Sequence, residues 1–260
     1  MIDTHCHLTD KRFDKDRQQV FDRAHASGVT HFVEIAYGPG IWEKGFALAA
    51  EHPNLFLAVG VHPGESGKVP LDALPVLRDH ARHPRVVAIG EIGLDFYRDY
   101  APRADQMRWF EAQLALADEV GLPVIIHQRS ALEDVMGLLE RSRPAAGGVL
   151  HCFDQDVRTS ERARAIGFRL GLGGVLTYGH TDLDEAVRRA PQDALVLETD
   201  APYLEPEPRS LRRNEPGLLP RVVRRLCELR DWTPAYAAEV TTRNARELFR
   251  LPPGGPATRA

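Results

Sequence analysis

A repeating rhythm of short apolar runs and longer amphipathic stretches is the feature that most constrains the fold of this chain. Eight runs rich in β-branched and other apolar residues fall at 2–5, 31–36, 55–61, 86–91, 123–127, 148–151, 168–171 and 195–199. Stretches of helical period follow them, at 16–26, 42–51, 71–81, 103–119, 131–140, 157–166, 182–189, 218–229 and 234–249. Runs of the first kind indicate strands, and stretches of the second kind indicate helices.

This alternation predicts the fold class. Strands that alternate with helices form parallel sheets with right-handed crossovers, and near-continuous apolar strands are typical of sheets covered on both faces. Eight such units predict a single (β/α)8 TIM barrel of the α/β class, and 260 residues is close to the length of about 250 typical of that fold. An open doubly wound sheet is the alternative. We expect the barrel domain to span residues 1–251 and residues 252–260, rich in Pro and Gly, to form a flexible tail.

Charge and cysteine content limit the partners and the compartment. The formal net charge of −4 gives the whole protein no attraction for nucleic acid, so a phosphate-binding surface is expected only as a local patch. The first residues form no basic and apolar leader, and no run approaches the roughly 20 apolar residues that span a bilayer. Three widely spaced cysteines are typical of free thiols in a reducing compartment. We therefore expect a cytoplasmic protein with no membrane contact and no obligate protein partner.

Polar side chains stand at the carboxyl ends of the predicted strands. In chain order these residues are His5, His7, His62, Glu91, His127, His151 and Asp200. In a barrel all of these strand ends meet at one mouth, where barrel enzymes carry out their chemistry. Residues far apart in the sequence are therefore expected to converge.

The segment His5-Cys6-His7 has the spacing of half a metal site. Alternation along a strand places both imidazoles, together with Asp3, on one face and turns Cys6 to the other. Two neutral imidazoles on one face can bind a divalent cation. Two unrelated polar residues near a terminus are the alternative interpretation.

Glu91 lies in the run Gly90-Glu91-Ile92-Gly93-Leu94-Asp95. A carboxylate at the end of an apolar strand is costly to bury alone, and one carboxylate can bridge two cations, so we expect Glu91 at the centre of a two-metal site. A structural ion pair is the alternative. Asp95 is expected to support the site or its loop. The four histidines with Glu91 and Asp200 form a nitrogen and oxygen shell that suits Zn, Mn, Co, Ni or Mg.

Other chemistries fit the sequence less well. The chain has no G-x-S-x-G elbow, no P-loop and no G-x-G-x-x-G at a strand–helix turn. Cys6 and Cys152 adjoin predicted ligands but should point away from them by alternation. We interpret both cysteines as packing residues.

With these residues in view, the sequence resembles the TatD family of metal-dependent deoxyribonucleases, within the amidohydrolase-like TIM barrels. The resemblance covers residues 1–250 and several motifs in order. They are D-T-H-C-H (3–7), G-V-H-P (60–63), I-G-E-I-G-L-D-F (89–96), P-V-I-I-H-Q-R (123–129), H-C-F (151–153), L-E-T-D-A-P-Y-L (197–204), R-N-E-P (213–216) and N-A-x-x-L-F (244–249).

The resemblance implies a metal assignment and an activity. One metal would be held by His5, His7, Glu91 and Asp200, and the other by Glu91, His127 and His151. The implied activity is divalent-metal-dependent cleavage of DNA phosphodiester bonds, as a 3′–5′ exonuclease on single strands or 3′ ends, with Mg, Mn or Zn. Departures from the family pattern at Ser130, at Asp154-Gln155 and in residues 209–216 leave the ligands intact. They bear on substrate fit at the rim, so polarity and base preference stay open.

A catalytic hypothesis follows. Two cations about 3.5–4 Å apart can clamp the attacking and leaving oxygens of a phosphoryl displacement and activate a water. Glu91 would bridge the cations, and Asp200 would orient the water and take its proton. His62 is expected to contact the scissile phosphate or a third metal that arrives with substrate.

Further residues near the strand ends are predicted to bind substrate. Arg129, Arg209, Arg213 and Asn214 are expected to position backbone phosphates, and Tyr203 to stack on a base or sugar. Solvated surface is the alternative for the arginines, and wall packing is the alternative for Tyr203. Solvated surface is the favoured interpretation for Arg212, Arg221, Arg224 and Arg225.

Three rival functions remain open. A hydrolase acting on a C–N bond or ester of a small molecule is the first, although many such enzymes have a lysine carbamate in place of Glu91. A PHP-type phosphoesterase is the second, although Asp200 is followed by Ala201-Pro202 and not by x-His. A non-catalytic binding module is the third, and the complete ligand set argues against it. The natural substrate, whether DNA, RNA or damaged ends, is not fixed by the sequence.

Overall fold

The apolar runs form one parallel sheet. The computed structural model describes residues 1–98, 100–209, 211 and 213–252. The strands within these residues are β1 (Ile2–Cys6), β2 (His31–Ala36), β3 (Leu55–Val59), β4 (Val86–Asp95), β5 (Val124–Arg129), β6 (Gly148–Leu150), β7 (Phe168–Leu172) and β8 (Leu195–Leu197). Neighbouring strands are parallel and follow the order of the chain from β1 to β8.

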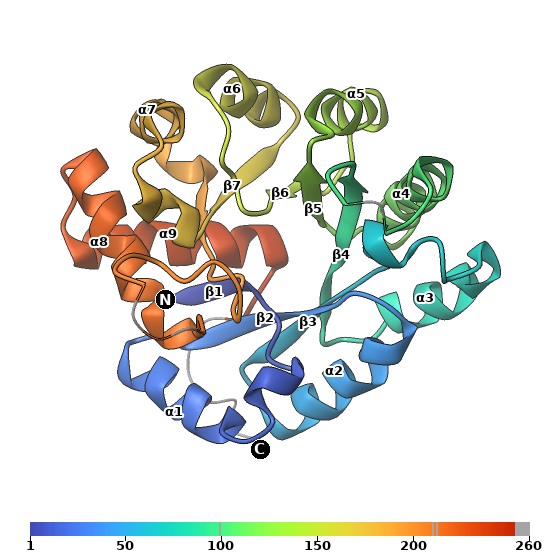
Figure 1. Ribbon diagram of the computed structural model, residues 1–260, viewed down its shortest axis with the longest axis horizontal. Coiled ribbons are helices and arrows are strands. Elements are labelled where there is room, and N and C mark those ends of the chain that lie inside the picture. Colours follow the sequence, from blue (N-terminus) through green and yellow to red (C-terminus); the bar gives the residue numbers. More distant parts are fainter. Residues whose placement is uncertain (99, 210, 212, 253–260) are drawn as a thin grey trace.

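The last strand end returns to the first. A parallel bridge joins Cys6 to Ala201. The Asp200 N–H donates to the His5 carbonyl at 2.9 Å, and the His7 N–H donates to the Ala201 carbonyl at 2.8 Å. This closure confirms the predicted (β/α)8 barrel (Figure 1).

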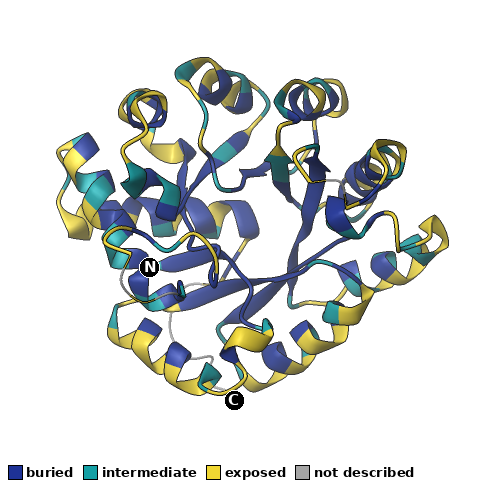
Figure 2. Ribbon diagram, viewed as in Figure 1, coloured by how far each residue is buried: buried dark blue, intermediate teal, exposed yellow. Residues whose placement is uncertain are grey.

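Helices cover the outside of the barrel (Figure 1). They are α1 (Arg17–Ala26), α2 (Pro39–Glu51), α3 (Leu74–Ala81), α4 (Arg103–Val120), α5 (Leu132–Ser142), α6 (Val157–Ala165), α7 (Thr181–Arg189), α8 (Leu219–Arg230) and α9 (Pro234–Phe249). Short 3-10 segments are η1 (Lys11–Phe13), η2 (Pro63–Glu65), η3 (Leu71–Ala73), η4 (Gly174–Tyr178), η5 (Gln192–Ala194) and η6 (Pro216–Leu218). Figure 2 shows buried helix faces toward the sheet and exposed faces toward solvent, as amphipathic periodicity predicts.

Two apolar layers hold this architecture together. The larger one lies between strands and helices and includes Phe32 and Phe110. The other fills the barrel with alternate strand residues such as Val33 and Ile35, and it includes Leu248 and Phe249 of α9. Helix α9 therefore closes one end of the barrel with apolar side chains, and polar chemistry is confined to the other end.

Strand β4 runs further than the sequence predicts. The predicted strand ended at Glu91, whereas β4 continues to Asp95. Gly93 makes the extension possible because its φ is +137° and an added Cβ would lie 2.0 Å from the His127 carbonyl oxygen. Glycine alone tolerates both conditions. The consequence is that Glu91 sits within the strand and not at its end.

Other boundaries differ by a few residues. Strands β6 and β8 end before the predicted His151 and Thr199, so that His151 and Asp200 lie just beyond their strands. Helix α3 begins at Leu74 with Pro75 in its first turn, a position where proline loses no hydrogen bond. The preceding residues form η3 instead of a first helical turn.

The predicted tail lies almost wholly outside the described residues. The description ends at Pro252, and residues 253–260 are not part of it. The domain boundary at residue 251 therefore stays a prediction. In the described part of the chain, no helix combines the length and the apolar character that crossing a membrane requires.

Candidate metal centre

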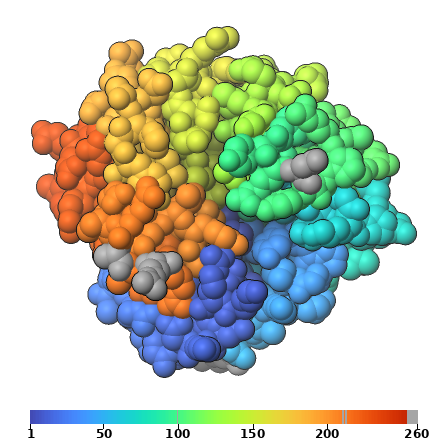
Figure 3. Space-filling model, in the orientation of Figure 1, coloured from blue at the N-terminus to red at the C-terminus, as the bar shows by residue number. Residues whose placement is uncertain are grey.

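The predicted ligands converge at the carboxyl end of the barrel. Each lies at the end of a strand, within it near that end, or in the residues just after it. Figure 3 shows this face, with the blue segment after β1, the green segment after β4 and the orange segment after β8 around its centre. The residues that the structure brings together are His5, His7, His62, Glu91, His127, His151 and Asp200.

His5 and His7 point toward one place, together with Asp200. The two Nε2 atoms are 3.3 Å apart. Asp200 Oδ1 lies 3.2 Å from His7 Nε2 and 3.6 Å from His5 Nε2. Between the histidines, Cys6 turns away, and its Sγ lies 3.4 Å from the Val33 carbonyl oxygen. The alternation predicted for this segment is therefore confirmed.

Glu91 faces imidazoles from four strand ends. Its Oε2 lies 3.5 Å from His5 Nε2. Its Oε1 lies 2.7 Å from His127 Nδ1, 3.7 Å from His151 Nε2 and 3.8 Å from His62 Nε2. The central position predicted for this carboxylate matches the geometry, and the bridging of two metals stays a prediction.

Asp95 stands behind His127. Its Oδ2 lies 3.3 Å from His127 Nε2. Its Oδ1 accepts hydrogen bonds from the backbone N–H groups of residues 97 and 98, at 3.1 and 3.0 Å. Asp95 therefore orients an imidazole and orders the loop after β4, which are the two roles expected of it.

Glu198 is a site residue that the sequence analysis did not single out. It is fully buried, and its Oε1 lies 2.8 Å from His151 Nδ1 and accepts the Cys152 N–H at 2.6 Å. Gly171 leaves room for it, since a Cβ there would lie 2.2 Å from Glu198 Oε2. Glu198 is two residues from Asp200, and both carboxylates lie just beyond β8 and approach His151. That spacing is the signal that could have identified it.

Two other buried carboxylates brace the backbone around the first strand end. Asp3 accepts the Thr199 N–H at 2.9 Å and the Thr199 hydroxyl at 2.6 Å, which ties β1 to the segment after β8. Glu34 on β2 accepts the N–H groups of Leu8 and Thr9 at 2.6 and 3.0 Å. Both carboxylates are engaged by backbone and hydroxyl donors, so they support the H-x-H segment from either side.

Two buried amides of α4 hold the loops after β3 and β4. Gln113 accepts the Val61 N–H at 2.6 Å and donates to the Val61 carbonyl at 3.1 Å, directly before His62. Gln106 makes the same pair of contacts with Asp95, at 2.9 and 3.1 Å. Helical periodicity in the sequence does not separate these glutamines from exposed ones, so sequence reasoning missed them.

Burial and close contact shift the pKa values of the site. Burial opposes ionisation of Glu91, but the surrounding imidazoles hold its pKa well below the ordinary value. Burial also opposes protonation of His127, yet hydrogen bonds to Asp95 and Glu91 raise its pKa to about 9. The pKa of His151 rises to about 10 in the same way, against burial and chiefly because of Glu198. The carboxylates thus favour the protonated, positively charged forms of these imidazoles.

This donor set fits a divalent cation. The Nε2 atoms of His5 and His7 face each other at 3.3 Å. In the neutral tautomers that carry the proton on Nδ1, both Nε2 atoms have a free lone pair, and neither can donate a hydrogen bond to the other. A cation between them accepts both lone pairs. The donors are imidazole nitrogens and carboxylate oxygens, the combination typical of Zn or Mn sites and compatible with Mg at its oxygens. The Nδ1 atoms of both rings are also buried without a partner among the described residues.

The cysteines next to the ligands have no part in the donor set. Cys6 packs in the core between sheet and helices. Burial raises the pKa of the Cys152 thiol well above its ordinary value, so it stays neutral. Among the described residues, the groups with metal-binding spacing contain neither cysteine.

Three predicted substrate residues lie at the rim of the mouth. The Arg129 guanidinium carbon is 4.0 Å from the centre of the Tyr97 ring. The Arg209 guanidinium carbon is 4.0 Å from the centre of the Tyr178 ring. Tyr203 is 46% exposed. Their positions allow the predicted contacts with substrate, which stay predictions.

Arg213 and Asn214 are engaged inside the loop after β8. The Arg213 guanidinium binds the Asp16 carboxylate through two hydrogen bonds of 2.8 and 2.7 Å. Asn214 is fully buried, and its amide donates to the carbonyls of Thr199 and Tyr203 at 2.7 Å each. Both side chains hold the loop in place, and a substrate contact for either stays a prediction.

The arginines interpreted as surface residues divide into two kinds. Arg224 is exposed, as expected. Arg221 and Arg225 are only partly exposed, since Arg221 donates to a backbone carbonyl of the loop after β8 and Arg225 pairs with Asp184. Arg212 lies outside the described residues.

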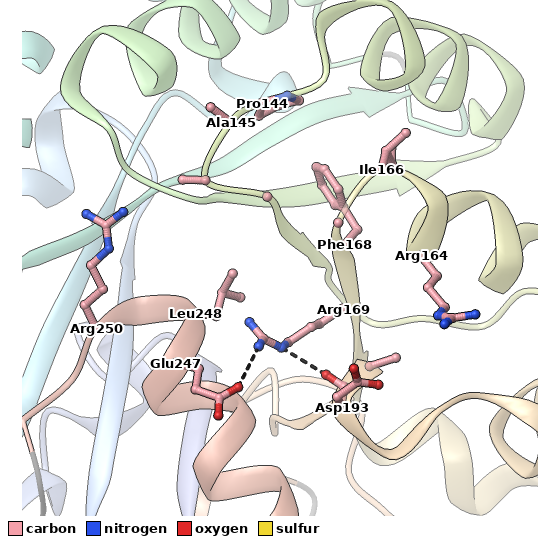
Figure 4. A pocket seen from close by; sticks show the side chains of 14 residues that line it. Pro144, Ala145, Arg164, Ile166, Phe168, Arg169, Asp193, Glu247, Leu248 and Arg250 are labelled. Atoms are coloured by element: carbon pink, nitrogen blue, oxygen red, sulfur yellow. Dashed lines mark hydrogen bonds and ion pairs between the residues drawn. The ribbon is translucent and has the colours of Figure 1, made fainter.

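A hollow of about 540 Å³ lies at the opposite end of the barrel, beside the starts of β6 and β7 and the end of α9. At its floor Arg169 donates to the Asp193 carbonyl at 3.1 Å and to Glu247 at 3.3 Å (Figure 4). Arg164 and Arg250 stand at its sides. Its lining contains none of the predicted ligands, so this hollow is separate from the metal centre.

Comparison with known proteins agrees with this geometry. The sequence profile of a family described as TatD related DNase matches residues 2–250. A metal-dependent hydrolase of Bacillus subtilis, YabD, described as uncharacterized, is 36% identical over 253 residues, which cover 96% of this chain and 99% of that protein. A Rahnella protein named 3′-5′ ssDNA/RNA exonuclease TatD is 37% identical over 260 residues, covering 96% and 98%. The crystal structure of the Escherichia coli K12 TatD homologue YJJV matches with a TM-score of 0.92 at 32% identity, covering 97% and 98%. The chain therefore belongs to the TatD-related DNase family, as its motifs predicted.

Proposed function

We propose that this chain is a divalent-metal-dependent exonuclease that hydrolyses DNA phosphodiester bonds from 3′ ends. The observation that carries the proposal is the position of Glu91. One buried carboxylate has an oxygen toward His5 and its other oxygen toward His127, at 3.5 and 2.7 Å. A carboxylate shared in this way suits a pair of cations, the arrangement that many phosphodiester hydrolases use.

The ligands divide between two cation sites. One would be held by His5, His7, Asp200 and Glu91, and the other by Glu91, His127 and His151. When bound, the cations supply Lewis acidity that polarises the phosphate and lowers the pKa of water. The choice among Mg, Mn and Zn is left to experiment, since each accepts part of this donor set.

Asp200 is the proposed general base. Burial opposes its ionisation, but His7 and the other imidazoles lower its pKa below the ordinary value, so the carboxylate is ionised and has a free site for a proton. It lies at the edge of the site, 9% exposed, with Oδ1 3.2 Å from His7 Nε2. A water held between this carboxylate and the phosphate would lose its proton to Asp200 as it attacks.

His62 is the proposed phosphate contact. Its Nδ1 accepts the Gly64 N–H at 2.9 Å, which puts the proton of the neutral ring on Nε2. Burial, reinforced by the neighbouring His127, lowers the pKa of His62 to about 3, so the ring is neutral at pH 7. Nε2–H is then a hydrogen-bond donor aimed into the site. This arrangement favours a phosphate oxygen over a third cation as its partner.

The substrate and setting extend the proposal. The Rahnella relative is named for action on single-stranded DNA and RNA, and we assign single strands or 3′ ends to this chain as substrate. The residues of the centre come from one chain, which suits an enzyme that works without an obligate protein partner. We place it in the cytoplasm, where its cysteines stay reduced.

A digest of oligonucleotides labelled at the 5′ or the 3′ end tests the proposal. Single strands and duplexes are compared in Mg, Mn and Zn, and the control is Asp200→Asn. We expect 5′-labelled single strands to shorten progressively from the 3′ end, and the variant to lose this activity while it stays folded. Turnover of a simple amide or ester without nucleotide release would replace the proposal with a small-molecule hydrolase. Tight DNA binding without turnover in any metal would replace it with a binding module.

A further inference from the structure

Exposed tyrosine rings gather around the metal centre. Tyr97 and Tyr100 follow β4, and Tyr203 follows β8, with exposed fractions of 65%, 59% and 46%. The segment with Tyr97 and Tyr100 follows Asp95 directly, and Tyr203 lies three residues after Asp200. Exposed rings at the rim of a polar site mark a surface that meets a ligand with flat apolar faces.

Tyr97 is paired with Arg129 across two strand ends. The guanidinium carbon of Arg129 is 4.0 Å from the centre of the Tyr97 ring. Because the guanidinium covers one face of the ring, the 65% exposure of Tyr97 comes from the other face and the edges. Arg129 follows His127 by two residues on β5, so alternation points it to the side of the metal centre.

The positive charge of Arg129 is free for a ligand. Among the described residues, no carboxylate or carbonyl accepts a hydrogen bond from its guanidinium or pairs with it. The pair of Arg12 and Tyr203 is the useful contrast. There the guanidinium lies 4.2 Å from the ring centre and is bound by Asp10 through two hydrogen bonds of 2.9 Å. Unlike the Arg12 and Tyr203 pair, the pair on the β4–β5 side offers both a ring face and a cation with no carboxylate partner among the described residues.

The Tyr97 segment is fixed to the metal centre. Asp95 lies 3.3 Å from His127 Nε2 through one carboxylate oxygen, and its other oxygen accepts the Tyr97 N–H at 3.1 Å. The Phe96 N–H donates to the Arg129 carbonyl at 2.9 Å. The residues that carry the ring, the guanidinium and the imidazole are therefore linked by hydrogen bonds, which fix Tyr97 and Arg129 relative to His127.

Building on the proposed nuclease function, we propose that Tyr97 and Arg129 form a nucleotide clamp. The ring stacks on an unpaired base, and the guanidinium binds the phosphate that links this nucleotide to its neighbour. Stacking on an aromatic ring is tolerant of sequence because every base has a flat face, and a guanidinium fork matches phosphate oxygens. The clamp thus recognises a single strand without distinguishing its base sequence.

The clamp determines strand preference. A base inside a duplex is stacked on both faces and paired at its edge, so it must be taken out of the helix before a protein ring can stack on it. Single strands and frayed ends present such bases at little cost. The proposed single-strand preference is therefore assigned to the Tyr97 and Arg129 pair.

Kinetics on two substrates test the clamp. One substrate is a short thymidine oligonucleotide, and the other is bis(p-nitrophenyl) phosphate, which has the diester but no base. The variants are Tyr97→Ala, Tyr97→Phe and Arg129→Ala, with Tyr236→Ala and Arg164→Ala as matched exposed controls away from the mouth. Binding of a phosphorothioate oligonucleotide is followed by fluorescence anisotropy.

Tyr97→Ala is expected to raise KM and Kd for the oligonucleotide by about 5- to 100-fold. Its turnover of bis(p-nitrophenyl) phosphate should stay within about twofold of the parent, as should every activity of Tyr97→Phe, because the ring is kept. Arg129→Ala is expected to weaken oligonucleotide binding and to reduce its dependence on salt by a slope of about 0.7. The single-strand advantage over duplex should fall in Tyr97→Ala.

Two outcomes would overturn the clamp. The first is oligonucleotide binding by Tyr97→Ala that equals binding by Tyr236→Ala. The second is an equal loss on both substrates, which would mark a structural role. Failure of the nuclease proposal is distinguishable, because there the parent protein itself releases no nucleotides. The anisotropy measurement still decides the clamp in that case.

Discussion

Charged side chains are matched by partners at one end of the barrel and crowded together at the other. At the amino-terminal end, Arg169 donates to Glu247 and to the Asp193 carbonyl, so its charge is matched within the chain. At the carboxyl end, the Glu91 carboxylate is 4% exposed and faces several imidazoles at once. The first arrangement is complete without a ligand, whereas we propose that the second is completed by divalent cations.

This difference separates residues that serve stability from residues that serve chemistry. Barrel enzymes concentrate conserved chemistry at the carboxyl face and structural contacts at the other. Crowded titratable groups with shifted pKa values mark functional sites. An ion pair whose charges are matched within the chain, such as the one in the hollow, is explained by its contribution to stability. Substitutions of the crowded, unmatched charges at the mouth should therefore cost activity, and substitutions of matched charges should cost stability alone.

The largest effect is expected from Glu91→Gln. The change removes the charge that both halves of the centre share, so the number of divalent cations bound per chain should fall. Nuclease kcat/KM should drop by roughly a thousandfold or more, the scale seen when charge stabilisation at a reacting centre is removed. Metal analysis after gel filtration and oligonucleotide kinetics measure the two results.

The matched control for that experiment is Glu247→Gln at the other end, where the carboxylate side chain is 56% exposed. It should keep full metal content and activity. Full metal content and activity in Glu91→Gln as well would show that the central carboxylate is a structural ion pair, and the contrast between the two ends would lose its basis.

A smaller loss is expected from Glu198→Gln. Glu198 touches no proposed reacting atom and acts through His151, 2.8 Å away. Replacing such a supporting carboxylate lowers metal affinity or activity by about 10- to 100-fold. Metal titration should show weaker binding with the oligonucleotide KM unchanged. A raised KM with normal metal affinity would contradict a positioning role.

The sequence was sufficient for the barrel and for the convergence of the predicted ligands. Each predicted ligand ends or follows an apolar run, so strand order and the closure of a barrel were enough to bring His5 and His151 together. Strand β4 shows what could not be predicted from the sequence. Its extension to Asp95 depends on how closely Gly93 approaches the His127 carbonyl, a contact between strands that no local pattern encodes.

The supporting residues were harder to predict because their partners are remote in the chain. Arg213 binds Asp16, which lies 197 positions away, so no local pattern indicates that its guanidinium is occupied. Glu198 is the opposite case. Its two-residue spacing from Asp200 was visible, but only the structure shows that its carboxylate reaches His151.

At the amino-terminal end, Arg169→Ala should lower stability and leave catalysis unchanged. The variant loses the hydrogen bond to the Asp193 carbonyl and the ion pair with Glu247. Together these contacts are worth about 1–2 kcal/mol, which corresponds to roughly 2–8 °C in Tm for a chain of this size. Calorimetry and oligonucleotide kinetics check the two halves of the prediction. A loss of activity at full stability would mean that this end communicates with the metal centre.

The smallest effect is expected from Asp16→Asn, at the mouth but in a complete charge cluster. Asp16 is bound by Arg213 and Arg23, which lower its pKa from 3.8 to about 2. The stability that it contributes is therefore fully present above pH 4 and is lost as the pH falls toward 2, where the folded carboxylate also protonates. Because the carboxylate is one-third exposed, the contribution at pH 7 should be at most about 1 kcal/mol. The stabilities of the variant and the parent in urea unfolding should differ at pH 7 and converge as the pH falls from 4 to about 2, with equal nuclease activity at pH 7. A difference that persists unchanged into acid would show that the side chain acts through packing and not through its charge. A variant that loses nuclease activity at full stability would show that the Asp16 and Arg213 pair serves catalysis. A charged residue at the mouth would then matter for activity because of its position, even when its charge is matched within the chain.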